Sequence, residues 1–210
     1  MSPSPDPRLA VLSGMRLKGA TDGAGLAEHT GLPRSLVDEQ LQALADEGLA
    51  VEHTGRLRGW GLTPAGRVAA ERCMSAEVEA AGARPAVARA YEVFRPLNTV
   101  ALDTFSRWQV RELAGRTVVN DHSDPVYDAG VIRDLARLQR KVEPVLGELG
   151  RALDRYRAYG PRLRRAVERV EAGDGDWFTK PSLPSCHTVW FELHEDLLTT
   201  LGLDRSAEVA

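Results

Sequence analysis

Residues 25–67 read GLAEHTGLPRSLVDEQLQALADEGLAVEHTGRLRGWGLTPAGR and carry the clearest structural pattern in the chain. Apolar residues recur there at the three- and four-residue spacing of an α-helix, first before Gly31 and again over residues 36–44. Pro33 suits the first position of the second helix, where its missing N–H is not needed, and Gly48 can end that helix. The stretch therefore predicts a short helix, a turn and a longer helix.

The period of the pattern changes after this helix. Residues 49–53 alternate between apolar and polar side chains, residues 54–55 are the turn-forming pair Thr-Gly, and residues 57–62 offer a returning strand. Thr63 is a good N-cap and Pro64 a good first helical residue, so a further helix is predicted to follow the hairpin.

A short helix is also predicted ahead of this stretch, because Leu9, Leu12 and Met15 recur every three residues before Gly19. The order of helix, helix-turn-helix, hairpin and helix is that of a winged helix. Over roughly residues 8–80 the pattern resembles the winged helix-turn-helix of the MarR and related regulator families. The resemblance rests on the spacing of Leu26-Ala27, Gly31, Leu36-Val37, Leu41, Leu44, Gly48-Leu49, Val51 and the closing Leu62-Thr63-Pro64-Ala65-Gly66-Arg67.

The resemblance implies a DNA-binding surface. In such regulators the helix that here spans residues 33–47 enters the major groove, and the hairpin over residues 51–62 lies along the backbone or minor groove. By that analogy the candidate base readers are Arg34, Ser35 and Gln42. The candidate phosphate or minor-groove contacts are Arg56 and Arg58 in the hairpin.

The charge of this region argues against DNA binding. Residues 1–70 hold seven basic groups against eight acidic ones, and the expected reader helix has four carboxylates after its single arginine. Binding driven by phosphate contacts needs several lysines or arginines facing the duplex. A winged-helix adaptor that contacts protein and does not bind DNA specifically is therefore the alternative function.

Residues 83–210 are predicted to be helical almost throughout. Apolar stripes run over residues 87–94 and 97–108, and a heptad-like seam runs from Leu135 to Tyr156. A final amphipathic helix is predicted over residues 185–201, and the seam or this helix is expected to supply the dimer contacts.

Breaks are predicted at three places in this half. Pro96 is expected to restart the chain, and Pro144 to kink or restart a helix near residues 141–143, because proline removes a helical hydrogen bond. Residues 114–125 lose the apolar periodicity and are predicted to be a polar loop.

Charge in this half divides into two blocks. Residues 133–169 hold eleven basic groups against five acidic ones, and residues 171–210 hold eight acidic groups against two basic ones. Pairing of the two blocks within the chain or across a dimer is one interpretation, and solvated helix faces are the usual form of such runs. A third is an anion-binding or second nucleic-acid-binding surface at Arg162, Arg164, Arg165 and Arg169.

Two clusters invite chemical interpretations. Asn120, His122 and Asp128 lie within a polar segment, but their spacing fits no calcium loop, and His194-Glu195 does not continue into the HExxH zinc motif. We therefore predict no metal and no cofactor. The polar residues from His187 to Asp196 are expected to form a surface face or an inter-subunit contact.

The large aromatics of this half, together with nearby histidines, are candidates for an effector pocket, since aromatic walls with a few polar groups typify small-molecule sites. The ligand-binding candidates are Trp108, His122, Tyr127, Trp177, His187 and Trp190. Filling of the hydrophobic core is the ordinary role of aromatics at a content of about 6%, and the effector pocket is the more specific alternative.

Composition sets the remaining expectations. The chain has 210 residues, 43% of them hydrophobic, with two widely spaced cysteines and a formal charge of −3. No apolar run approaches the roughly 18 residues of a membrane span, and the start MSPSPDPR lacks the apolar run of a secretion signal, so a cytoplasmic protein is expected. No catalytic motif is recognisable, so an enzyme is not expected.

Taken together, the sequence predicts a mostly α protein with two domains. A winged helix-turn-helix domain with a two-stranded wing is expected over residues 1–82, and an all-helical dimerisation and effector domain over residues 83–210. The expected function is that of a homodimeric transcriptional regulator that binds double-stranded DNA and responds to a small molecule.

Overall fold

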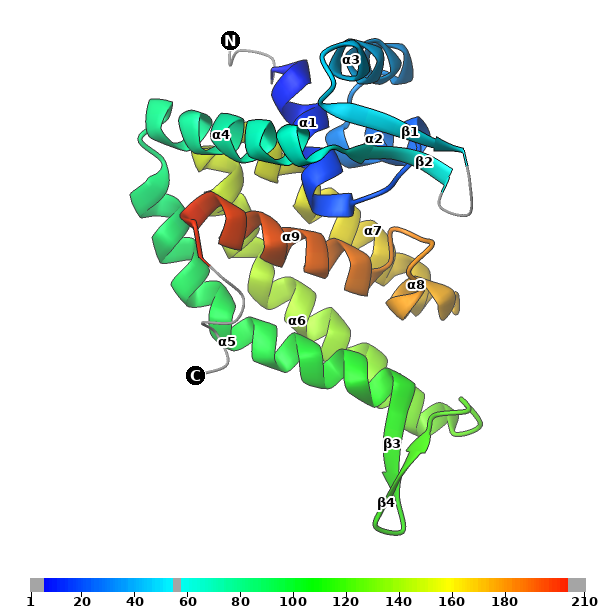
Figure 1. Ribbon diagram of the computed structural model, residues 1–210. Coiled ribbons are helices and arrows are strands. Elements are labelled where there is room, and N and C mark those ends of the chain that lie inside the picture. The colour runs from blue at the N-terminus through cyan, green and yellow to red at the C-terminus, as the bar shows by residue number, and fades with distance from the viewer. Residues whose placement is uncertain (1–5, 55–57, 204–210) are drawn as a thin grey trace.

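The computed structural model describes residues 6–54 and 58–203. The first part of the chain, which we call the N-terminal half, forms three helices, a wing-like antiparallel hairpin and a fourth helix (Figure 1). Its elements are α1 (Pro7–Lys18), α2 (Gly23–Thr30), α3 (Arg34–Asp46), β1 (Ala50–Thr54), β2 (Arg58–Leu62) and α4 (Pro64–Ala80). The predicted order of helices and strands is confirmed for the described residues.

Local hydrogen bonds explain where these helices begin. The side chain of Asp22 accepts from the backbone N–H of Gly25 at the start of α2, and Thr63 accepts from Gly66 at the start of α4. Gly66 is also required sterically, because a Cβ at that position would lie 1.9 Å from the carbonyl oxygen of Leu49. The Thr-Pro-Ala-Gly sequence after the hairpin is thus both a cap and a close packing contact.

The rest of the chain, the helical half, is built around a long antiparallel helix pair. Its elements are α5 (Arg84–Gln109), β3 (Val110–Leu113), β4 (Arg116–Val119), α6 (Pro125–Ala152), the 3₁₀-helix η1 (Asp154–Ala158), α7 (Tyr159–Glu171), α8 (Asp176–Thr179) and α9 (Cys186–Leu201). Helix α9 lies between the N-terminal half and the pair formed by α5 and α6, and it contacts elements of both halves (Figure 1).

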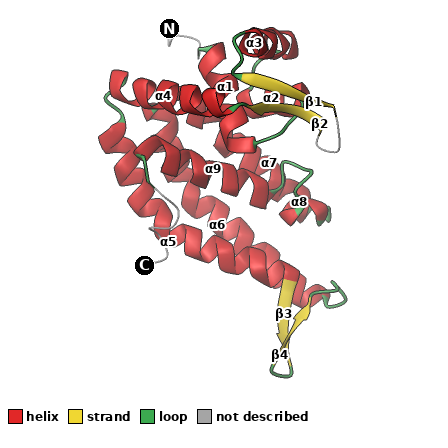
Figure 2. Cartoon of the chain, in the orientation of Figure 1, coloured by secondary structure: helices red, strands yellow, loops and turns green. Residues whose placement is uncertain are grey.

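The expectation of an all-helical second domain is wrong, and the predicted polar loop over residues 114–125 is confirmed only for residues 120–124, because residues 116–119 form a strand. Strands β3 and β4 form a second hairpin that projects from the end of the α5–α6 pair, far from the first hairpin (Figure 2). Its two-residue turn places Ala114 at φ 51° and Gly115 at φ 74°. Hairpin turns of this kind need positive φ at both positions, and alanine there gives no sequence signal of a turn.

The expected helix restarts at two prolines are also wrong. Helix α5 runs continuously through Pro96, and α6 runs continuously through Pro144. Each proline removes one helical hydrogen bond, but buried apolar residues on both sides of it pack between α5 and α6. Packing along the whole pair therefore outweighs the local loss.

The described residues form two hydrophobic clusters. One lies among α1–α4, with members such as Leu12, Val37 and Leu44, and the larger one fills the helical half. The heptad-like seam, including Leu135 and Leu149, is buried in this larger cluster. The apolar side chains of the seam are therefore packed within the chain, and the source of the expected dimer contacts, the seam or the terminal helix, stays a prediction.

We predict that Leu149→Ala lowers the free energy of unfolding by about 2–5 kcal/mol, since Leu149 is fully buried and its truncation leaves a cavity. Urea unfolding followed by circular dichroism measures this change. Val126→Ala, on the same helix but 78% exposed, is the matched control and should change stability by less than about 0.5 kcal/mol. Equal effects of the two substitutions would contradict the burial of the seam.

Candidate functional site

Helix α3 presents one buried and one exposed side. Val37, Leu41 and Leu44 point into the core of the N-terminal half, and the opposite side of the helix carries Arg34, Ser35 and Gln42. The helix packs on α1, α2 and β1 and lies on the side of this half that faces away from α5 and α6 (Figure 1). The structure therefore brings the three candidate base readers together on one accessible face.

The electrostatics of this face are mixed. The Nε of Arg34 donates to Asp38 at 2.8 Å, and the Nε2 of Gln42 donates to Asp46 at 2.9 Å. Glu39 is exposed on the same helix. The outward side of α3 thus carries one arginine and three carboxylates. The side chains of Arg34 and Gln42 are each hydrogen-bonded to a carboxylate four residues further along the same helix.

The wing-like hairpin is fixed to the body of the N-terminal half. Strand β2 bridges to the connection between α1 and α2, where Trp60 and Thr21 exchange backbone hydrogen bonds of 2.7 and 3.1 Å. Gly59 makes this approach possible, because a Cβ there would lie 2.6 Å from the Thr21 carbonyl oxygen. Arg58 is exposed next to the tip of the hairpin. Arg56 falls outside the described residues.

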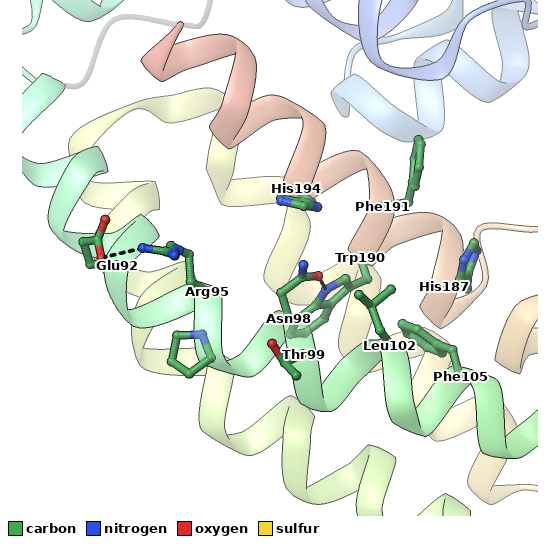
Figure 3. Close-up of a pocket in the computed structure, with 11 residues that line it drawn as sticks. Glu92, Arg95, Asn98, Thr99, Leu102, Phe105, His187, Trp190, Phe191 and His194 are labelled. Carbon is green, nitrogen blue, oxygen red and sulfur yellow. Dashed lines mark hydrogen bonds and ion pairs between the residues drawn. The ribbon is translucent and has the colours of Figure 1, made fainter. Parts of the chain in front are cut away.

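Two of the six ligand-binding candidates border a cavity of about 650 Å³ between α5 and α9. His187 and Trp190 come from α9, and residues such as Asn98 and Phe105 come from α5 (Figure 3). Asn98 accepts a 2.9 Å hydrogen bond from the indole N–H of Trp190 through its Oδ1. The cavity has the size and mixed lining of a small-molecule site.

The aromatic wall of this cavity is held rigidly. Trp190 stacks on Phe94 with ring centroids 5.0 Å apart, and His187 meets the ring of Phe105 edge-on at 5.2 Å. Burial lowers the pKa of His187, so its imidazole is neutral at neutral pH. A neutral imidazole beside phenyl rings suits an uncharged, flat part of a ligand.

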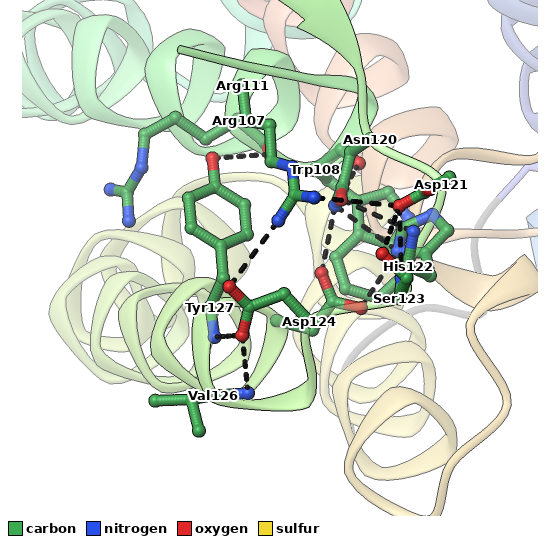
Figure 4. A network of polar contacts seen from close by, with 11 residues as sticks. Arg107, Trp108, Arg111, Asn120, Asp121, His122, Ser123, Asp124, Val126 and Tyr127 are labelled. Carbon is green, nitrogen blue, oxygen red and sulfur yellow. Dashed lines mark hydrogen bonds and ion pairs between the residues drawn. The ribbon is translucent and has the colours of Figure 1, made fainter. Parts of the chain in front are cut away.

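Two other candidates lie at the base of the second hairpin. Trp108 stacks on Phe178 with ring centroids 4.3 Å apart and borders a separate, open cavity of about 780 Å³ together with His122. His122 has φ 59° and contacts Asp128 through Nδ1 at 2.9 Å, while Asn120 bonds to the same carboxylate (Figure 4). This network joins the end of β4 to the first turn of α6.

The last two candidates have structural partners. The hydroxyl of Tyr127 donates to the carbonyl of Arg107 at 3.0 Å (Figure 4). The ring of Trp177 lies beneath the guanidinium groups of Arg165 and Arg169. The six candidates therefore do not converge on one pocket: two border the cavity between α5 and α9, two border the cavity at the second hairpin, and Tyr127 and Trp177 border neither.

An ionic cluster that no sequence pattern predicts joins the two halves. Glu192 on α9 is 2% exposed. It accepts hydrogen bonds from Lys18 Nζ at 2.7 Å and His29 Nδ1 at 3.0 Å, both from the N-terminal half. Arg162 on α7 donates to the same carboxylate at 2.5 Å. The charge of Glu192 is thus shared between cations of both halves.

The pKa values in this cluster follow from burial and charge. Burial lowers the pKa of His29, and the charges of Arg162 and Lys18 lower it further, against the effect of the hydrogen bond to Glu192. His29 is therefore neutral at neutral pH and donates through Nδ1–H. Burial alone would raise the pKa of Glu192, but its hydrogen bond with His29 and the nearby positive charges hold that pKa well below its usual range.

A second buried ion pair lies one turn further along α9. Asp196 is 1% exposed and accepts from Arg155 Nε and from the hydroxyl of Tyr159, both at 3.1 Å. Arg155 also pairs with Glu77 on α4. The expectation that residues 187–196 form a surface face is wrong, because Glu192, His194 and Asp196 are buried. The expected pairing of the two charge blocks within the chain is confirmed at Arg155 and Arg162.

No family model, curated protein or solved structure matches this chain. Within residues 6–54 and 58–203, no group of three or more His, Cys, Asp and Glu side chains is placed to hold a metal ion. No helix in that part of the chain is long and apolar enough to span a membrane. A functional proposal for this chain therefore rests on the geometry of α3, the wing-like hairpin and the cavities described above.

We predict that Glu192→Gln destabilises the protein by about 3–5 kcal/mol at neutral pH, because it leaves buried positive groups without their countercharge. Glu168→Gln, on the exposed side of α7, is the control and should have little effect. Urea unfolding of both variants and of the unaltered chain measures the difference.

The difference in unfolding free energy between Glu192→Gln and the unaltered chain is expected to depend on pH. A carboxylate with a depressed folded-state pKa contributes stability that is present above its unfolded pKa and is lost as the pH falls through the folded value. The difference between Glu192→Gln and the unaltered chain should therefore shrink as the pH drops below about 4. If this difference in unfolding free energy stays constant from pH 7 to pH 3, the stabilising effect of Glu192 does not depend on its negative charge.

Proposed function

We propose that this protein is a transcriptional regulator that binds double-stranded DNA as a homodimer in the cytoplasm. Helix α3 enters the major groove, and the wing-like hairpin contacts the flanking backbone. The observation that carries this proposal is the accessible side of α3, which bears Arg34, Ser35 and Gln42 and faces away from the helical half. A second copy allows two such helices to engage two half-sites about one DNA turn apart.

The side chains on α3 have the chemistry that base recognition needs. A guanidinium such as that of Arg34 can bond to O6 and N7 of guanine, and an amide such as that of Gln42 can bond to N6 and N7 of adenine. Both groups must first leave their intrahelical carboxylate partners. These partners are exposed, so the exchange costs only about 0–1 kcal/mol for each pair.

Charge limits the strength of this binding. Each positive side chain that contacts phosphate makes affinity more sensitive to salt, and α3 offers one arginine beside three carboxylates. Arg58 adds a positive group from the hairpin. Affinity is therefore expected to be moderate, and discrimination between sequences to depend on base contacts more than on phosphates.

The carboxylates on α3 favour a second candidate function, the protein-interaction adaptor. An exposed helix face with Asp38, Glu39 and Asp46 is complementary to a basic protein surface. In that case α3 would bind a partner protein with the same face that we assign to DNA, and binding to DNA would stay at the nonspecific level of about 10⁻⁴ M or weaker.

Three substitutions test DNA binding, measured by salt-titrated fluorescence anisotropy on DNA from upstream of the protein's own gene. Arg34→Ala should reduce discrimination between this DNA and a scrambled duplex by about 1–3 kcal/mol. Arg58→Ala should weaken binding to both duplexes and reduce the salt slope by about 1. Glu39→Gln should strengthen binding, because it removes a negative charge from the face of α3.

Arg89→Ala, an exposed arginine on α5, is the matched control and should leave binding unchanged. The DNA assignment fails if the unaltered chain prefers neither duplex. If Glu39→Gln instead weakens capture of a basic partner protein, the adaptor function takes its place.

A further inference from the structure

One part of the cavity between α5 and α9 is an apolar cleft. Trp190 and Phe105 are buried along it, and Leu102 is 58% exposed beside them (Figure 3). Glu92 and Arg95 border the same cavity nearer the N-terminal end of α5 and are not part of this cleft. We call the apolar part the Trp190 cleft, and its residues are Asn98, Leu102, Phe105, His187 and Trp190.

Asn98 supplies hydrogen-bond donors at one end of the Trp190 cleft. Its side chain is bonded to the indole N–H of Trp190 at 2.9 Å (Figure 3). An indole N–H can only donate, so the bonded atom of Asn98 is its amide oxygen. The Nδ2 of Asn98 has no hydrogen-bond partner among the residues that the structure describes. The free N–H donors of this amide therefore suit a ligand that presents a carbonyl oxygen.

His187 supplies a second polar group at the other end of the cleft. Its ring meets Phe105 edge-on at 5.2 Å and lies 6.4 Å from the ring of Phe191. Within the described part of the chain, neither ring nitrogen of His187 takes part in a hydrogen bond. A neutral imidazole has one donor and one acceptor nitrogen, and a hydroxyl group can bond to either.

The distance between these two polar groups sets the length of the ligand. Seven residues of α5 separate Asn98 from Phe105, a rise of about 10 Å along the helix, and His187 contacts Phe105. The surface between the two ends comes from Leu102, Phe105 and Trp190. A flat body of two fused rings with an oxygen at each end has the length to reach both polar groups and covers the apolar surface between them.

We propose that the Trp190 cleft binds an uncharged, flat bicyclic aromatic compound with a carbonyl at one end and a hydroxyl at the other. The carbonyl accepts a hydrogen bond from Nδ2 of Asn98, and the hydroxyl bonds to a ring nitrogen of His187. The rings lie against Leu102, Phe105 and Trp190, where burial of the flat apolar surface drives binding.

Helix α9 connects this cleft to the contact between the two halves. His187 and Trp190 belong to α9, and Glu192, two residues after Trp190, bonds to Lys18 and His29 of the N-terminal half. A ligand that moves α9 relative to α5 therefore disturbs the cluster that holds α1 and α2. This regulatory consequence, unlike the binding itself, rests on the proposed DNA-binding function.

Isothermal titration calorimetry on the full chain at neutral pH tests the site without DNA. The probes are umbelliferone, which has both polar groups, coumarin, which lacks the hydroxyl, and β-naphthol, which lacks the carbonyl. Asn98→Asp keeps the oxygen that accepts from Trp190 and removes the N–H donors. It should therefore weaken binding of umbelliferone and coumarin by about tenfold or more and leave β-naphthol unchanged.

A second variant tests the other end of the cleft. His187→Phe keeps an aromatic ring and removes the ring nitrogens, so it should weaken binding of umbelliferone and β-naphthol by about tenfold and leave coumarin unchanged. The probe that each variant retains also reports that its cleft is folded. Gln109→Glu makes the same change from amide to carboxylate on α5 outside the cavity, and it should bind all three probes like the unaltered chain.

Three results would overturn the proposed site. The first is that umbelliferone does not bind to the unaltered chain at about millimolar concentration. The second is that Asn98→Asp and Gln109→Glu bind umbelliferone equally. The third is that His187→Phe binds umbelliferone like the unaltered chain.

The DNA assay repeated with saturating umbelliferone separates the site from the proposed function. Ligand binding in calorimetry with no effect on DNA affinity would overturn the regulatory link and leave the site. DNA binding without any calorimetric signal would overturn the site and leave the proposed function.

Discussion

The arrangement of the two halves depends on one buried carboxylate. Glu192 is almost fully enclosed, and its charge is acceptable there only because Lys18, His29 and Arg162 surround it. Buried ion pairs add little net stability compared with an apolar contact, but loss of one partner is costly. Such a cluster therefore acts mainly as a geometric constraint. Glu192 on α9 keeps all of its partners only when α1, α2 and α7 hold one position relative to α9.

Helix α9 consequently has two roles that are usually separate. It is the central packing element of the helical half, with Leu193 and Leu197 fully buried, and it also carries the polar groups that meet the N-terminal half. Polar residues inside a helix that is buried on several sides need specific partners. Glu192 has partners on both halves, and Asp196 is bonded to Arg155, which itself pairs with Glu77 on α4. A shift of α9 would therefore disturb charged contacts with α1, α2 and α4.

The sequence predicts the local elements well and the long-range contacts poorly. Helices with a regular apolar stripe and a capping residue, such as those begun by Asp22 and Thr63, follow from spacing alone. Local propensity predicts helix restarts at Pro96 and Pro144, and these do not occur, because packing between α5 and α6, which no local pattern shows, keeps both helices continuous. The partners of Glu192 lie 174 and 163 residues away at Lys18 and His29, and no periodic pattern indicates such pairs.

The same contacts change how the charge of the chain should be interpreted. A count of basic residues treats every lysine and arginine as available at the surface, yet Lys18, Arg155 and Arg162 are enclosed by carboxylates of the chain itself. The positive charge that can meet DNA is therefore smaller than the composition implies, and on the described part of the α3 and hairpin surface it comes from Arg34 and Arg58. Under the proposed function, a surface with so little positive charge gains little from counterion release, so DNA recognition would depend on the fit of α3 to base edges and on the two copies of the proposed dimer.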